Sequence, residues 1–130
     1  MGKVYAYVLP EKRESLSALL QSLGLQEGVL VPGDLSRTLE QIVGSDARSA
    51  KRVPGAEPRG EQPQAPPFYR MPEVLLFCGL TDEELDRFLD AYRESALPAI
   101  VCRAVVTPFN LGWTLYRLIR ELEEEHRSMG

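Results

Sequence analysis

Residues suited to metal or redox chemistry are scarce in this chain. Its 130 residues include two cysteines, one histidine and one tryptophan. Cys78 and Cys102 both stand in apolar, strand-like runs, far from a second cysteine or a histidine that could complete a metal set. We expect buried, reduced thiols, with a redox pair between neighbouring strands as the alternative. No metal site is predicted.

The chain also lacks a long apolar run and the short motifs of common enzymes. No stretch of 18 apolar residues is present, so no membrane span is expected, and the start from Met1 to Tyr5 is typical of a strand rather than of a cleavable signal. There is no glycine-rich phosphate loop and no nucleophile elbow, and His126 has no neighbour with which to form a triad. These absences favour a cytoplasmic protein without a cofactor, and a binding role over an enzymatic one.

The charge balance bears on the class of partner. The formal net charge is −4, and acidic residues outnumber basic ones between Glu73 and Arg127. An acidic half is a poor match for a phosphate backbone, so nucleic acid is not expected as a partner. Without a membrane span or a nucleic-acid partner, an unknown protein or a second copy of the chain is the expected partner.

The apolar pattern predicts two similar halves, each ordered strand, helix, strand, break, helix. The first half is predicted to hold strands at Val4–Val8 and Val29–Val31, a helix from about Glu11 to Gly24, and a helix from Leu35 to Gly44 with Asp34 as its cap. The second half is predicted to hold strands at Val74–Cys78 and Ala99–Val106, a helix opened by the capping box of Thr81 and Glu84, and a long helix from Pro108 capped by Thr107.

A fixed spacing links the two halves. Six residues of the first half have a similar or identical counterpart 76 positions later: Pro32, Asp34, Leu35, Thr38, Leu39 and Ile42 match Pro108, Asn110, Leu111, Thr114, Leu115 and Leu118. Such a register favours an internal duplication over a coincidence of apolar patterns. We therefore predict an α/β fold in which two βαβα half-repeats form one four-stranded sheet with flanking helices. The order of strands between the halves stays open.

A proline-rich stretch separates the halves. Apolar periodicity is lost from Ser45 to Pro67, which predicts a flexible linker. The expected organisation is a first half at 1–44, a linker at 45–70 and a second half at 71–130, with both halves in one domain. Pro63 and Pro66 have the spacing of a polyproline ligand, but a plain proline-rich spacer is the preferred explanation. Phe68 and Tyr69, at its end, are expected to pack back on the domain.

The C-terminal half also has a familiar pattern. Val105, Val106, Thr107, Asn110, Trp113, Thr114, Leu115, Leu118 and the acidic tail ending in Glu125 and His126 resemble a small bacterial family known as domain of unknown function 3783. The resemblance covers about residues 74–127. It implies a shared fold unit and brings no activity, cofactor or partner with it.

Four residues form a candidate ligand site. Ligands of open α/β sheets bind beyond the carboxyl ends of the strands, where helices begin. Asp34, Thr107 and Asn110 are predicted to lie there, and Arg103 interrupts an apolar run where a charge needs water, a carboxylate or a ligand. The simpler alternative is that Asp34 and Thr107 only cap helices and that Arg103 faces solvent on an edge strand.

Trp113 points to a second candidate surface. The apolar stripe of the last helix runs through Leu111, Leu115, Leu118, Ile119 and Leu122, and Trp113 projects from the opposite side, with Arg117 and Arg120. Tryptophan and arginine dominate the energetics of protein interfaces. The leading hypothesis is thus a non-catalytic binding module, self-associating through the Trp113 face. A small-molecule or anion binder, or a minor enzyme, that uses a cleft at the helix starts is the alternative. Trp113 is otherwise explained if the rest of the chain covers it.

Overall fold

The computed structural model of this chain describes residues 2–44, 64–95, 97, 100, 102–107 and 110–129. Most of the predicted linker, including Pro63, lies outside the described residues. So do Ala99 and Pro108, the predicted starts of a strand and of a helix.

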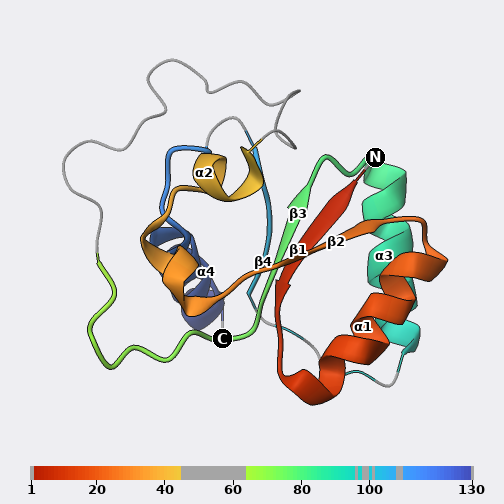
Figure 1. The fold of residues 1–130 in the computed structure, drawn as a ribbon, viewed down its shortest axis with the longest axis horizontal. Helices are drawn as coiled ribbons and strands as arrows, with labels where there is room; N and C mark the ends of the chain where they lie inside the picture. Colours follow the sequence, from red (N-terminus) through yellow and green to blue (C-terminus); the bar gives the residue numbers. More distant parts are fainter. Residues whose placement is uncertain are drawn as a thin grey trace.

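The described strands form one mixed sheet. The four strands are β1 (Lys3–Tyr7), β2 (Gln26–Val29), β3 (Val74–Cys78) and β4 (Cys102–Val105), in the order β2-β1-β3-β4. Strands are parallel within each half, and β1 and β3 pair antiparallel at the centre, with Tyr5 opposite Leu76. The predicted four-stranded α/β sheet is therefore confirmed, and the order that the sequence left open places β2 and β4 at the two edges (Figure 1).

Helices cover both faces of the sheet. Helices α1 (Pro10–Ser22) and α3 (Asp82–Glu94) lie side by side on one face (Figure 1). The other face carries the 3-10 helix η1 (Pro32–Ser36), α2 (Leu39–Val43) and α4 (Leu115–Met129). Each face has its own apolar core, because alternate side chains of the central strands point to opposite faces of the sheet. For this reason all five residues of β3 are buried.

Local signals set the ends of the first helix in each half. Pro10 opens α1, and Gly24 follows its end with a φ of 72°, a conformation that glycine adopts at little cost. In α3 the Thr81 hydroxyl accepts the Glu84 N–H at 3.1 Å, while the Glu84 carboxylate accepts the Thr81 N–H at 2.9 Å. The predicted capping box is confirmed.

The predicted starts of the second helix in each half are wrong, whereas Gly44 ends α2 as predicted. The chain from Pro32 to Val43 forms two short helices, because Thr38 caps a new start: its hydroxyl accepts the Gln41 N–H at 3.2 Å. Likewise α4 begins at Leu115, with the Thr114 hydroxyl accepting the Arg117 N–H at 3.2 Å. Thr107 is therefore not the cap of α4.

The predicted second strand is displaced along the chain. It was expected at Val29–Val31, but β2 occupies Gln26–Val29. Leu30 still donates its N–H to the Ala6 carbonyl at 2.9 Å, and then the Val31 N–H turns to the Asp34 carboxylate at 3.0 Å. This side-chain acceptor ends the strand before the apolar run is complete.

Equivalent residues of the halves make equivalent contacts. The Leu30 bond to Ala6 has a counterpart in the Val106 N–H, which donates to the Phe77 carbonyl at 2.8 Å. Thr38 and Thr114, 76 residues apart, form an antiparallel bridge. On either side of it, the Leu39 N–H donates to the Trp113 carbonyl at 2.9 Å and the Leu115 N–H to the Arg37 carbonyl at 3.0 Å. The halves are thus arranged about an approximate two-fold axis.

Candidate functional site

Asp34 and Asn110, two of the predicted ligand residues, each close a turn at the end of an edge strand. The Asp34 carboxylate accepts the Val31 N–H at 3.0 Å and also accepts from the Arg37 guanidinium at 3.1 Å. The Asn110 side-chain oxygen accepts the Thr107 N–H at 2.9 Å. Both side chains therefore hold backbone geometry, as asparagine and aspartate do in turns.

The structure does not gather the four predicted ligand residues at one place. The turns of Asp34 and Asn110 lie on the α4 face of the sheet, where the residues that follow them, Leu35 and Leu111, pack into the core. Arg103 instead lines a pocket of about 440 Å³ against α3, together with Leu89, Tyr92, Arg93 and Leu97. Arg103 is exposed on the edge strand β4, the simpler of its two predicted placements.

Trp113 lies in the turn before α4 and not on the helix itself. Its side chain is half-buried against the core of the α4 face, and the Arg117 guanidinium lies over the indole, 4.6 Å from the ring centre. Arg120 lies 6.0 Å above the ring of a different residue, Tyr116. The three residues predicted as one interaction surface are thus distributed over two aromatic contacts.

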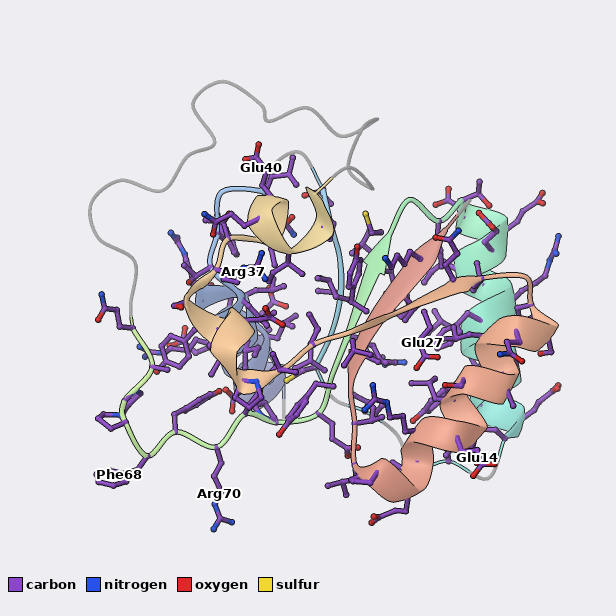
Figure 2. The ribbon with its side chains drawn as sticks, in the orientation of Figure 1. Glu14, Glu27, Arg37, Glu40, Phe68 and Arg70 are labelled. Atoms are coloured by element: carbon purple, nitrogen blue, oxygen red, sulfur yellow. The ribbon has the colours of Figure 1, made fainter. Side chains whose placement is uncertain are left out.

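The end of the predicted linker packs back on the domain through one of its two aromatic residues. The Tyr69 ring meets Tyr116 edge to face at 4.9 Å, and the Tyr69 hydroxyl donates to Glu123 at 3.3 Å. Burial raises the pKa of Tyr69, and the nearby Glu123 carboxylate raises it further. Phe68 points away from the fold, with 95% of its surface exposed (Figure 2).

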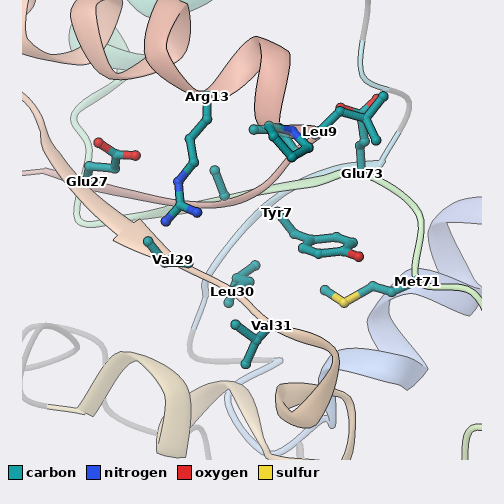
Figure 3. A pocket seen from close by; sticks show the side chains of 12 residues that line it. Tyr7, Leu9, Arg13, Glu27, Val29, Leu30, Val31, Met71 and Glu73 are labelled. Atoms are coloured by element: carbon teal, nitrogen blue, oxygen red, sulfur yellow. The ribbon is translucent and has the colours of Figure 1, made fainter.

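A surface that sequence reasoning missed lies at the open edge of β2. Leu9, Val29 and Val31 are 49%, 49% and 50% exposed, and all three line one pocket of about 310 Å³ (Figure 3). Tyr7, Leu30 and Met71 add apolar surface to its wall. Single exposed apolar residues are common, but three around one hollow mark a candidate binding surface.

The charged groups of this pocket differ in their pairing. The Glu73 carboxylate accepts from the Lys12 ammonium at 2.7 Å and from the Leu9 N–H at 3.0 Å. Glu27 accepts the Ser17 hydroxyl at 2.6 Å. Arg13, by contrast, extends from α1 toward the strands (Figure 3), and no carboxylate among the described residues lies within ion-pair distance of its guanidinium. Arg13 is therefore a cation available to a partner.

The backbone of β2 also has hydrogen-bonding groups that no described residue uses. Gln26 donates its N–H to Gly2 and Leu30 to Ala6, so these alternate residues face β1. The alternation of a parallel ladder directs the N–H and C=O groups of Glu27 and Val29 to the outer side, where no described element pairs with β2. Such an edge is a template for a further strand.

The opposite edge is partly closed by a side chain. The Asn110 amide donates to the Val105 carbonyl of β4 at 3.0 Å. Asp34 occupies the matching position of the first half, but a carboxylate has no hydrogen to donate to the equivalent carbonyl of Val29. The difference between one asparagine and one aspartate leaves β2 the more open edge.

Part of this surface could have been recognised from the sequence. Gln26 and Glu27 begin β2, and polar residues on both faces of a strand indicate an edge position. The placement of Leu9 and Val31 beside them depends on tertiary structure.

Comparison with known proteins agrees with the resemblance noted above. Residues 73–129, the C-terminal part of the chain, match the family model described as a domain of unknown function (DUF3783). Neither curated proteins nor solved structures give a significant match. Within the described residues, no group of three His, Cys, Asp or Glu side chains could hold a metal ion. No helix in the same part of the chain has the length and apolar character needed to cross a bilayer.

Proposed function

We propose that this chain is a non-catalytic binding module that takes its partner at the open edge of β2. The observation that carries the proposal is that three half-exposed apolar side chains, Leu9, Val29 and Val31, lie beside backbone groups of β2 that no described element pairs with. An extended segment laid along β2 would satisfy those groups and bury the apolar side chains together.

The energetics favour a partner that uses both features. Each new backbone hydrogen bond contributes about 0.5–1.5 kcal/mol net, because water is displaced from both groups. Burying apolar surface contributes about 25 cal/mol per Å², and Leu9, Val29 and Val31 still expose half of theirs. A strand with apolar side chains at alternate positions matches this surface, since alternate side chains of a strand point to the same face.

Two other candidate sites receive less support. Asp34 and Asn110 already bind backbone N–H groups, so a ligand at the helix starts would have to displace those turns. The indole of Trp113 is half-buried and covered on one face by Arg117. We therefore place the interaction surface on β2 rather than on Trp113, Arg117 and Arg120.

The wider setting of the module forms part of the same proposal. Cys78 and Cys102 are both buried and neither forms a disulfide bond, which suits a reducing cytoplasm. The bacterial family resemblance suggests a bacterial source. The equivalent contacts of Thr38 and Thr114 support an origin by duplication of one βαβα unit.

A peptide-display selection tests the proposal. A library of random extended peptides is selected on the full chain, and binding is then measured on Val29→Asp and on Val105→Asp. Val105 is the matched control, because it is 42% exposed at the equivalent place on β4. We expect Val29→Asp to lose peptide binding and Val105→Asp to keep it. Peptides that bind both variants as well as the unaltered chain would overturn the proposal, as would a selection that yields no peptide for a chain that is monomeric.

A further inference from the structure

We propose that the occupant of the β2 edge is a second copy of this chain, bound antiparallel about a two-fold axis at Gly28. This inference rests on the proposed function, to which it adds the identity of the partner. The two sheets would join into one continuous sheet, with β2 of each copy at the centre. A two-fold contact of this kind is closed, so it forms a dimer and not a filament.

The outward backbone groups determine the register of such a pair. In an antiparallel ladder, a residue whose groups face the partner strand exchanges both hydrogen bonds with the residue opposite. The groups of Glu27 and Val29 face outward. If Glu27 lies opposite Val29 of the second copy, symmetry places Val29 opposite Glu27 of that copy, and Gly28 lies opposite itself. This register uses all the outward groups of both residues.

The charges favour the same register. Arg13 lines the pocket beside Val29, and it has no carboxylate partner within the described part of its own chain. Glu27 of the second copy, opposite Val29, would approach the Arg13 guanidinium. Both side chains lie on the same side of the sheet, because Glu27 accepts a bond from Ser17 of α1, the helix that also carries Arg13. Symmetry gives this ion pair twice.

Neighbouring registers are less favourable. With Glu27 opposite Glu27, two like charges would face each other, which is destabilising between strands. With Val29 opposite Val29, each Glu27 would lie beyond the paired residues and away from Arg13 of the other copy. The Glu27–Val29 register therefore combines the most hydrogen bonds with opposite charges.

The other edge is less suited to the same contact. The Asn110 amide already bonds to the Val105 carbonyl, which removes one of the outward acceptors of β4. Arg103 occupies the position of Glu27 on that edge and faces α3, where Arg93 adds a second positive charge. Pairing of β4 with itself would bring these like charges together.

The test is a charge-swap series on the full chain. Molar mass is measured over a concentration series by sedimentation for the unaltered chain, for Arg13→Glu, for Glu27→Arg and for the double variant. We expect a dimer for the unaltered chain and a dimer dissociation constant raised about tenfold by each single change. The double variant restores the charge pairs with reversed sign, so its dissociation constant should return to within about threefold of the original.

A proline at the edge gives a second, independent test. Val29→Pro removes an outward N–H without removing a bond to β1, whereas Val105→Pro is the matched change on β4. We expect only Val29→Pro to abolish the dimer, with circular dichroism verifying that both variants fold. If Val29→Pro does not fold, the charge-swap series decides.

Three results would overturn the inference: a monomer at all concentrations, a dimer indifferent to both charge reversals, or a double variant as weak as the single ones. A dimer that is lost in Trp113→Ala but kept in Arg13→Glu would assign self-association to the Trp113 face instead. A chain that stays monomeric but binds selected peptides through Val29 would refute the dimer and leave the proposed function in place.

Discussion

The halves of this molecule have the same backbone plan and different edges. Asp34 and Asn110 occupy equivalent turns and accept equivalent N–H groups, from Val31 and Thr107. Only the Asn110 side chain can also donate, and its amide donates a hydrogen bond to the Val105 carbonyl of β4. A single atom, nitrogen in place of oxygen, thus gives the two turns different hydrogen-bonding capacities at the ends of their edge strands.

The second helices differ more visibly. Helix α2 has five residues, whereas α4 has 15. Both are attached at their starts by the same bridge between Thr38 and Thr114. Gly44, with a φ of 51°, ends α2, while the second half continues through the apolar stripe that contains Leu118 and Ile119. The two helices thus share the bridge at their starts and differ in length.

The largest expected effect tests whether the halves fold as one unit. Leu39 and Leu115 are equivalent residues with no exposed surface, one in each second helix. Leu39→Ala and Leu115→Ala should each lower the free energy of unfolding by about 2–5 kcal/mol, because each leaves a cavity in the same core. Urea denaturation measures the loss, followed by circular dichroism and by tryptophan emission.

The coincidence of the two signals is the decisive observation. Because Leu39 and Leu115 belong to one apolar cluster, both variants should unfold in a single transition with an unchanged denaturant slope. A Leu39→Ala variant that loses helix content while the emission of Trp113 stays native would show that the halves unfold separately. Leu9→Ala, at a half-exposed position, serves as the control.

Much of the architecture could be predicted from the sequence because the signals were local. The strand Val74–Cys78 was placed to the residue, since a continuous apolar run bounded by Pro72 and Gly79 has few other structures. The capping box at Thr81 gave the start of α3. The offset of 76 identified residues that the structure shows in equivalent contacts.

The rest depended on contacts distant in the sequence. Nothing local revealed that β1 and β3 pair antiparallel, and this pairing is what places β2 at an edge. Nothing local separated Thr107 from Thr114 as the residue before the last helix, because both are threonines followed by apolar positions. The pocket at β2 combines Leu9, Val31 and Met71 from three segments, so only the fold could reveal it.

Exchanging the two turn residues should reverse the difference between the edges. Asn110→Asp removes the donor to the Val105 carbonyl and should lower the free energy of unfolding by about 0.5–1.5 kcal/mol. Asp34→Asn supplies a donor at the matching position and should weaken self-association by covering the Val29 carbonyl. Urea denaturation measures the first effect and sedimentation the second. Equal dimerisation by Asp34→Asn and the unaltered chain would contradict this account of the edges.

The smallest expected effect concerns a contact between the halves, made by Glu73, that has no counterpart at the equivalent position of the first half. Glu73, just before β3, accepts from Lys12 and from the Leu9 N–H, whereas the equivalent position before β1 is Gly2. Burial raises the pKa of Glu73, but these hydrogen bonds outweigh it and hold the pKa below its ordinary value of 4.5. A carboxylate with a lowered pKa stabilises the folded state above pH 4.5, and this contribution is lost as the pH falls through the folded pKa.

Glu73→Gln should therefore lower the free energy of unfolding by at most about 1 kcal/mol at pH 7, and the difference from the unaltered chain should vanish in acid. The urea midpoint between pH 7 and pH 3 measures it, with the exposed Glu14→Gln as control (Figure 2). A difference in stability that does not change with pH would mean that the Glu73→Gln variant loses packing contacts rather than the ion pair with Lys12. The link between the halves at Glu73 would then depend on side-chain packing and not on charge.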